Sequence, residues 1–127
     1  MLVDTDVLIW HLRGLAKATQ TLDRLSRLTI SAITYLEILQ GLRNGAELQA
    51  IQQSLTMRNT EQLPLTPAIT NRAIALMETL TLSHGLQLGD ALIAATALEH
   101  GFPVLTANTR HFSPIEGLQV ERFEPHG

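Results

Sequence analysis

The sequence predicts an α/β fold in which helices cover both faces of a central, mainly parallel sheet. Short apolar segments with strand character recur along the 127 residues, and longer segments with helical periodicity separate them. Parallel strands need crossover connections of about a dozen residues, which such helices provide. The chain length suits one hydrophobic core, and we expect a single domain over residues 1–127.

Glycine, asparagine and capping residues set the expected boundaries of the elements. Over the first half we expect a strand at 1–4, a helix from Thr5 or Asp6 to before Gly14, a helix over 16–27, a strand over 28–31, a helix capped by Ser31 and reaching Arg43, and a helix over 46–57. Over the second half we expect a weak strand over 62–65, a helix over 67–83 closed by Gly85, a helix over 88–100 closed by Gly101, a strand with a turn over 103–108, and a last strand in LQVERF.

The composition excludes several classes of protein. The chain has no cysteine, which rules out disulfides and thiolate metal sites and suits the cytoplasm. No apolar run approaches the ~20 residues of a membrane span, and Asp4 interrupts any signal-peptide core. The net charge of −3 is unusual for a nucleic-acid-binding protein, but six basic residues and only three acidic ones lie between residues 13 and 58. Aromatic residues make up 4%, so a base-stacking platform is not expected.

Two of the four aspartates interrupt the apolar opening MLVDTDVLIW. Asp4 and Asp6 follow the first strand at its carboxyl end, where ligands of α/β sheets bind. Asp6 has a structural explanation, because it can cap the next helix by accepting hydrogen bonds from free backbone N–H groups. Asp4 is expected to point into the crevice at the end of the sheet, with a turn or capping role as the alternative.

Two further acids lie on apolar helix faces. Glu37 has Ile33 and Gly41 one turn away, so it is either at the edge of the buried face or drawn inward by a partner. Asp90 begins LQLGDALIAATALEHG, on a stripe of small apolar residues suited to close packing against the sheet. The helix dipole favours an acid there by about 0.3–1 kcal/mol, less than the cost of burying its charge. A simple N-terminal cap is the alternative for Asp90.

Carboxylates gathered at one sheet edge repel each other and need a compensating charge. No lysine or arginine lies within three residues of Asp4, Glu37 or Asp90. A divalent cation with oxygen ligands is a compact alternative, and Mg²⁺ or Mn²⁺ suits carboxylate sites with open water positions. Such an ion activates water and neutralises charge on a phosphate.

The segments MLVDTDVLIW, ITYLEILQGLR and LGDALIAATALEHGFPVLTANTRHF together resemble the PIN-domain family, and within it the VapC-like toxin ribonucleases of bacterial toxin–antitoxin pairs. The resemblance covers essentially the whole chain and implies a three-layer α/β/α sandwich. It also implies that Asp4, Glu37 and Asp90 are catalytic and together bind Mg²⁺ or Mn²⁺. Asp6 matches a more variable polar position that can contribute a secondary contact to the metal or its water.

The sequence departs from the family pattern after the fourth strand, where a fourth acid is common. It has Asn108 and His111 there instead. Asn108 offers a carbonyl oxygen for a secondary metal contact or for positioning a water, and the turn after the strand is the alternative role. His111 is expected to be a packed or exposed surface residue. The missing acid leaves open whether one metal ion binds or two.

The resemblance implies metal-dependent hydrolysis of RNA, with a homodimer as the active form and a VapB-like antitoxin protein as the inhibitor. Arg13, Lys17 and Arg110 are candidates for contacts with RNA phosphates, against the alternative of solvated helix charges. Two other functions stay open. One is a catalytically impaired PIN-type module that binds RNA or protein. The other is a haloacid-dehalogenase-like phosphatase, which also begins with D-x-D, although Val-Leu follows that motif here.

Overall fold

The computed structural model describes residues 1–126, which form five strands and seven helices in alternation. The strands are β1 (Leu2–Val3), β2 (Thr29–Ser31), β3 (Glu61–Leu63), β4 (Val104–Thr106) and β5 (Val120–Arg122). The helices are α1 (Thr5–Leu12), α2 (Ala16–Asp23), α3 (Ala32–Gln40), α4 (Gly45–Met57), α5 (Pro67–His84), α6 (Leu88–His100) and α7 (Thr109–Phe112). The predicted α/β class is confirmed.

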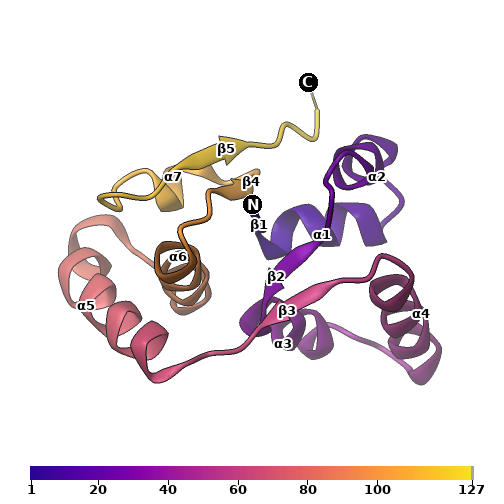
Figure 1. The fold of residues 1–127 in the computed structure, drawn as a ribbon, viewed down its shortest axis with the longest axis horizontal. Coiled ribbons are helices and arrows are strands. Elements are labelled where there is room, and N and C mark those ends of the chain that lie inside the picture. The colour runs from indigo at the N-terminus through magenta and orange to yellow at the C-terminus, as the bar shows by residue number, and fades with distance from the viewer. Residues whose placement is uncertain (127) are drawn as a thin grey trace.

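The strands form two parallel ladders, β1-β4-β5 and β2-β3. Because β2 lies next to β1, the order across the molecule is β3-β2-β1-β4-β5 (Figure 1). The chain runs from β1 to one side through β2 and β3, and later to the other side through β4 and β5. The strand order therefore reverses between β1 and β4, which is the point where α/β sheets bind their ligands.

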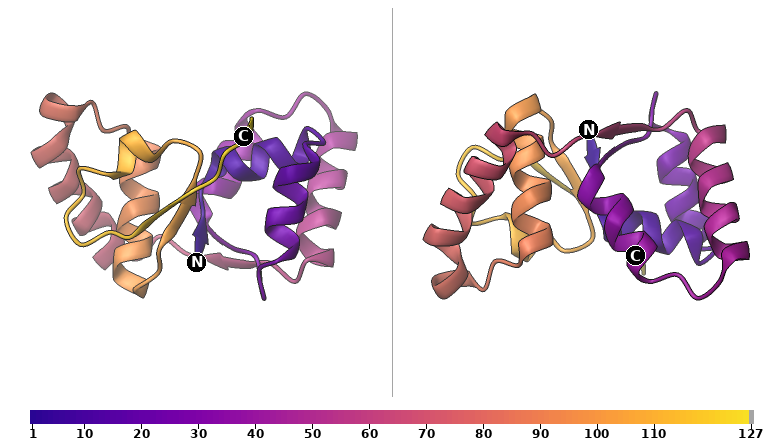
Figure 2. Two further views of the ribbon diagram at one scale, coloured as in Figure 1. Left: turned by 90° about the horizontal axis from the view of Figure 1, so that it is seen from above. Right: turned by 90° about the horizontal axis from the view of Figure 1, so that it is seen from below.

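Alternating side chains of the central strands supply two separate cores. Leu2 and Val104 belong to the core beneath α5, α6 and α7, whereas Val3 and Leu105 belong to the core beneath α1, α2, α3 and α4. Successive strand residues point to opposite faces, so two-residue β1 contributes to both cores. Figure 2 shows the two groups of helices on opposite sides of the strands. The three-layer arrangement is confirmed.

Most predicted boundaries are confirmed, and the differences have local causes. Ser31 caps α3, since its hydroxyl accepts a hydrogen bond from Ile33 N at 3.2 Å. That helix stops at Gln40 rather than Arg43, because Gly41, a weak helix former, is its C-cap. Asn44 lies beyond the end of α3 and caps α4, because its side chain accepts a hydrogen bond from Glu47 N.

Two other expectations were inaccurate. The second helix ends at Asp23 instead of reaching residue 27, and the four-residue helix α7 follows β4 where only a turn was expected. Gly85 and Gly101 close α5 and α6 as predicted, with φ of 65° and 69° in the left-handed region that favours glycine. Within residues 1–126, no helix combines the length and the apolar character needed to cross a membrane.

Candidate active site

Asp4 lies at the carboxyl end of β1, beside β4, where the strand order reverses. Its backbone N–H continues the ladder to Leu105 O at 2.9 Å, and its side chain is only 5% exposed. Oδ1 accepts a hydrogen bond from Thr5 N at 2.8 Å, which makes Asp4 the N-cap of α1. Oδ2 accepts a second hydrogen bond from Thr106 Oγ1 at 2.7 Å. The carboxylate is thus held on both sides at the sheet edge.

Asp6 faces the same edge from the first turn of α1. The expectation that Asp6 caps this helix was wrong, because the helix begins at Thr5 and Asp4 takes the capping position. Asp6 Oδ2 instead accepts a hydrogen bond from Ala107 N at 3.1 Å and lies 3.4 Å from Thr106 Oγ1. Its Oδ1 is buried and has no hydrogen-bond partner within the described chain. One oxygen of this carboxylate is therefore available to a ligand.

The burial of Asp4 and Asp6 next to each other is electrostatically unfavourable. Burial, followed by the charge of Asp6, raises the pKa of Asp4 from its usual 3.8 to about 8, against the opposing hydrogen bond from Thr106. Burial likewise raises the pKa of Asp6. Among residues 1–126, no lysine or arginine forms an ion pair with either aspartate. Bound positive charge would relieve this cost.

Glu37 reaches the cluster from α3, drawn inward by a hydroxyl partner. Its Oε1 accepts a hydrogen bond from Thr5 Oγ1 at 2.8 Å, and that hydroxyl also lies 3.0 Å from Thr34 Oγ1. The other oxygen packs against the first turn of α6, where a Cβ added to Gly89 would come within 2.8 Å of Glu37 Oε2. Thr5 and Gly89 therefore fix the position of this carboxylate between α1 and α6.

Asp90 lies in the first turn of α6 and does not cap it, since Gln87 is the N-cap. Asp90 Oδ2 is 2.9 Å from Nδ1 of His111 on α7. Burial raises the pKa of Asp90, and the neighbouring His111 opposes the shift. The charge of Asp90 also raises the pKa of Asp4, which places the two acids within electrostatic reach. His111 is an exposed residue, as expected, but sequence reasoning missed its contact with an acid of the site.

The four acids suit an oxygen-coordinated cation that keeps part of its water shell. In residues 1–126, no three His, Cys, Asp or Glu side chains form a ready metal-binding group. Mg²⁺, however, is commonly held by one or two carboxylates together with several waters. In the part of the chain that the structure describes, Asp6 Oδ1 has no hydrogen-bond partner and neither Asp4 nor Asp6 forms an ion pair, which fits such an ion.

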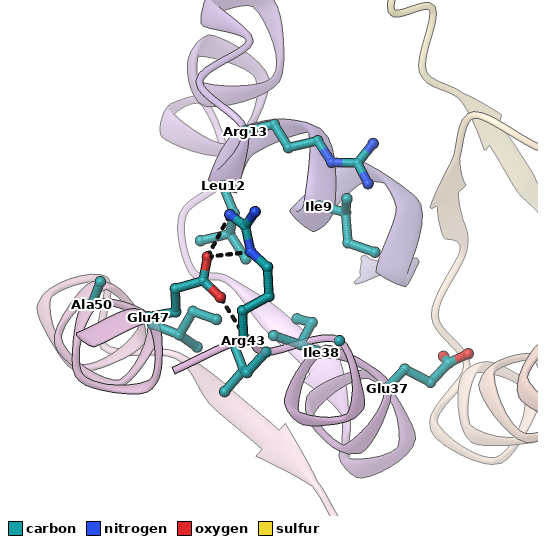
Figure 3. Close-up of a pocket in the computed structure, with 11 residues that line it drawn as sticks. Ile9, Leu12, Arg13, Glu37, Ile38, Arg43, Glu47 and Ala50 are labelled. Carbon is teal, nitrogen blue, oxygen red and sulfur yellow. Dashed lines mark hydrogen bonds and ion pairs between the residues drawn. The ribbon is translucent and has the colours of Figure 1, made fainter. Parts of the chain in front are cut away.

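A groove opens on the Glu37 side of the carboxylates, between α1, α3 and α4 (Figure 3). We call it the α1–α4 groove; its volume is about 630 Å³. Apolar side chains alternate with charged ones along it, and Arg43 pairs with Glu47 at 2.8 Å. The exposed Arg13 extends over the groove, whereas Lys17 on α2 is not part of its lining. The lining also includes Ile9, Leu12, Glu37, Ile38, Leu42 and Ala50.

A second hollow opens on the Asp90 side, where the C-terminal end of α5 approaches α7. We call it the α5–α7 hollow; its volume is about 780 Å³ and its lining is mainly polar. Arg110 lines it, as does the exposed Asn108, whose backbone N–H donates to Thr106 Oγ1 at 2.9 Å. The asparagine side chain does not cap α7.

Comparison with known proteins agrees with this geometry. The model of the PIN domain family matches residues 1–117. The chain belongs to the PIN domain family. It is 37% identical over 123 residues to Ribonuclease VapC10 of Mycobacterium tuberculosis, a match that covers 94% of this chain and 90% of that protein. The assignment confirms the resemblance and favours this family over the haloacid-dehalogenase-like phosphatases.

Solved structures of toxin–antitoxin complexes contain chains that share the fold. A toxin–antitoxin complex from Klebsiella pneumoniae contains a chain with a TM-score of 0.78 and 30% identity, covering 98% of this chain and 97% of that one. VapBC-1 from nontypeable Haemophilus influenzae gives 0.78 and 25% identity, with 95% and 96% covered. VapBC2 from Rickettsia felis, bound to a promoter DNA fragment, gives 0.81 at 19% identity, with 97% and 98% covered, and shows the fold alone.

The fold brings Asp4, Asp6, Glu37 and Asp90 to one sheet edge, with Arg13 in the lining of the α1–α4 groove and Arg110 in the lining of the α5–α7 hollow. Lys17, on α2, lines neither of them. Sequence reasoning missed the groups that hold the acids in place. For Thr5 the available signal was a hydroxyl residue between two aspartates. For Thr106 the available signal was a hydroxyl residue at the end of the fourth strand. The side chain of Thr106 reaches Asp4 only because β4 pairs with β1, and the sequence does not reveal this pairing.

Proposed function

We propose that this PIN domain is a Mg²⁺- or Mn²⁺-dependent endoribonuclease and the toxin of a toxin–antitoxin pair. The observation that carries the proposal is the buried Asp4–Asp6 pair at the point where the strand order reverses. Among the described residues, 1–126, Asp6 Oδ1 has no hydrogen-bond partner, and no arginine or lysine forms an ion pair with either aspartate. The relative that is 37% identical is a ribonuclease, and the structural relative at 30% identity belongs to a toxin–antitoxin complex.

Asp4, Glu37 and Asp90 would hold the ion, with Asp6 and Asn108 as secondary contacts to the metal or its water. When bound, the ion would supply positive charge at the phosphodiester and lower the pKa of an attacking water. The protein supplies the positions of the acids: Thr106 orients Asp4 at 2.7 Å and Thr5 orients Glu37 at 2.8 Å. Because both hydroxyls are fixed by the fold, the carboxylates are preorganised for a cation.

Hydrolysis adds water across one P–O bond of the RNA backbone. The water oxygen attacks phosphorus, a carboxylate of the cluster accepts the water's proton, and the leaving oxygen is protonated as its bond to phosphorus breaks. Arg13, Lys17 and Arg110 are proposed to bind phosphates along the RNA, since arginine and lysine contacts to the backbone position a nucleic acid without reading its sequence. One ion is sufficient for this scheme.

The proposed partner is a VapB-like antitoxin, and the proposed assembly is a homodimer in the cytoplasm. The α1–α4 groove supports a protein partner, because its lining mixes apolar side chains with charges of both signs. Glu37 lies in that lining, so a protein segment seated in the groove would reach the catalytic acids. This placement provides a route by which an antitoxin blocks the site.

The test is cleavage of cellular RNA by the purified chain in Mg²⁺ or Mn²⁺, compared with the same reaction in EDTA. Asp4→Asn is expected to lower the rate about 100-fold or more, because it removes a charge from the ion site. Asp23→Asn is the matched control, since Asp23 is exposed and pairs with Arg58 at 2.9 Å away from the carboxylates.

Cleavage that persists in EDTA or in Asp4→Asn would overturn the proposal. RNA binding without cleavage by the unmodified chain would favour the catalytically impaired binding module instead. Circular dichroism of each variant shows whether a loss of activity reflects the site or the fold.

A further inference from the structure

The α5–α7 hollow gathers side chains from two elements that are distant in the sequence. His84 comes from the last turn of α5, whereas Arg110 and His111 come from α7. Ser83, Ser113 and Asn108 complete the polar part of its lining. Figure 1 shows the end of α5 near α7, and residues of both helices line the hollow. The fold therefore creates a polar hollow that no local motif encodes.

The chemistry of this hollow suits an anion. Its described lining contains one guanidinium, two imidazoles, two hydroxyls and an amide, and no carboxylate. Within residues 1–126, Arg110 forms no ion pair, in contrast to Arg43 in the α1–α4 groove, whose charge is taken up by Glu47. An arginine without a carboxylate partner in a polar hollow is free to bind a phosphate.

One direct contact, and one that passes through Thr106, connect the hollow to the carboxylates. His111, which lines the hollow, lies 2.9 Å from Asp90 through Nδ1 and Oδ2. Asn108 N donates to Thr106 Oγ1 at 2.9 Å, and the same hydroxyl donates to Asp4 Oδ2 at 2.7 Å. A chain of phosphates that crosses the carboxylates on the Asp90 side would enter the hollow next.

We propose that the α5–α7 hollow is a subsite for a phosphate of single-stranded RNA adjacent to the bond that is cut, with His84 and Arg110 as its contacts. The inference rests on the proposed ribonuclease function and adds His84, which lies 26 positions before Arg110 in the sequence. The subsite positions the RNA by its backbone and is independent of base identity. RNA held there is fixed relative to the acids through His111 and Asn108.

The experiment measures RNA binding separately from cleavage. A fluorescent single-stranded RNA is titrated with the full chain carrying Asp4→Asn, in Mg²⁺, over a series of salt concentrations. Arg110→Gln in this background is expected to weaken binding about three- to fivefold and to reduce the slope of log K against log salt by about 0.7. His84→Gln is expected to weaken binding about twofold, by loss of an exposed polar contact.

Two control variants test whether weaker RNA binding is specific to the hollow or follows from the loss of any exposed basic side chain. Arg24→Gln removes an exposed arginine that lines neither cavity, and His100→Gln removes an exposed histidine at the opposite end of α6 from Asp90. Both are expected to leave affinity and salt slope within error of the parent. Circular dichroism spectra identical to the parent show that each variant is folded.

The inference is overturned if Arg110→Gln and His84→Gln bind RNA with the affinity and slope of their controls, or if the parent binds no RNA. Cleavage by the unmodified chain is assayed separately. If that chain cleaves RNA but Arg110→Gln binds RNA as tightly as its parent, the phosphate subsite is rejected and the ribonuclease function is not. An inactive chain whose binding still depends on Arg110 and His84 rejects the proposed catalysis alone.

Discussion

The two sides of the carboxylate cluster are built differently. On one side, Glu37 is held by the neutral hydroxyl of Thr5 and borders the α1–α4 groove, where apolar and charged side chains mix and Arg43 is neutralised by Glu47. On the other side, Asp90 is held by the imidazole of His111, which lines the α5–α7 hollow; the described lining of this hollow has basic residues and no acid. Asp4 and Asp6 lie between them.

This difference would let one small domain bind the two kinds of partner proposed for it. Mixed apolar and paired charged groups suit a protein segment, because the apolar groups gain from burial and the charges set its register. An unpaired guanidinium with imidazoles and hydroxyls suits a phosphate backbone. We expect a substitution on one side to change the binding of one partner and leave the binding of the other unchanged. A substitution at the centre should affect the whole site.

The largest expected effect comes from Asp4, at the centre. Its folded pKa of about 8 lies above the usual 3.8, so between these values the folded chain holds a proton that the unfolded chain has released. Stability without metal should therefore fall as pH rises from about 4 to 8, by up to about 1.4 kcal/mol per pH unit. Urea unfolding in EDTA measures this dependence.

Asp4→Asn should flatten that pH dependence and raise stability near pH 8, while Asp23→Asn should leave it unchanged. Added Mg²⁺ should restore stability to the unmodified chain at pH 8, because binding to the folded state alone stabilises it. A stability that is independent of pH in the unmodified chain would contradict the role given to burial of Asp4.

Gly89→Ala should have the next largest effect, because it lies at the contact between the two sides. The added Cβ would meet Glu37 Oε2 at 2.8 Å, so the carboxylate must move. Displacing a catalytic group by about 1 Å costs on the order of 100-fold in rate. Stability should change by less than about 1 kcal/mol, because a flexible carboxylate gives way and alanine favours the helix.

Gly45→Ala is the control for Gly89→Ala, since no heavy atom lies within 4 Å of its added Cβ. RNA cleavage and thermal unfolding are measured for both variants. Equal rates in the two variants would show that the position of Glu37 does not matter for activity.

Thr5, which contacts Glu37, and His111, which contacts Asp90, should differ in how much their substitution lowers the free energy of unfolding. Thr5→Val keeps the shape of a buried side chain but removes the donor to Glu37, at a cost of about 1 kcal/mol in the free energy of unfolding. His111→Ala should cost about 0.5 kcal/mol or less, because its side chain is 43% exposed. Chemical denaturation at neutral pH measures both, and a larger cost for His111→Ala would reverse the comparison.

The smallest effect concerns the antitoxin. Ala50→Glu adds a charge to the lining of the α1–α4 groove next to Glu47, and should weaken binding of a VapB-like antitoxin about threefold. Arg110→Gln, in the α5–α7 hollow, should leave that affinity unchanged. Calorimetric titration of the purified pair measures both. Weaker binding by Arg110→Gln alone would assign the antitoxin to the opposite side.

Helices and acids were predictable because their signals are local. Ser31 before an apolar run and glycines at positions 85 and 101 mark helix ends wherever the chain folds, and Asp4 follows a strand whatever its neighbours. The capping of α1 was assigned to the wrong aspartate, because Asp4 and Asp6 both suit the role and only the start of the helix at Thr5 distinguishes them.

Contacts between distant segments were not predictable. His111 was assigned to the surface since nothing in TRHF indicates that α6 places Asp90 2.9 Å away. His84 carried no signal because the hollow exists only where α5 and α7 meet. The site acids could be predicted from their positions after strands and on helix faces, whereas the groups that orient them depend on tertiary packing.

The pairing of β1 with β4 also affects when the molecule can fold. Leu2 pairs with Val104, and the bond from Thr106 to Asp4 joins residues 102 positions apart. Such long-range contacts form slowly and late, and a chain emerging from the ribosome at about 5–20 residues per second has its first strand long before its fourth. We therefore expect the carboxylate cluster to remain unassembled during most of translation, so that the site can become active only after β4 has been synthesised.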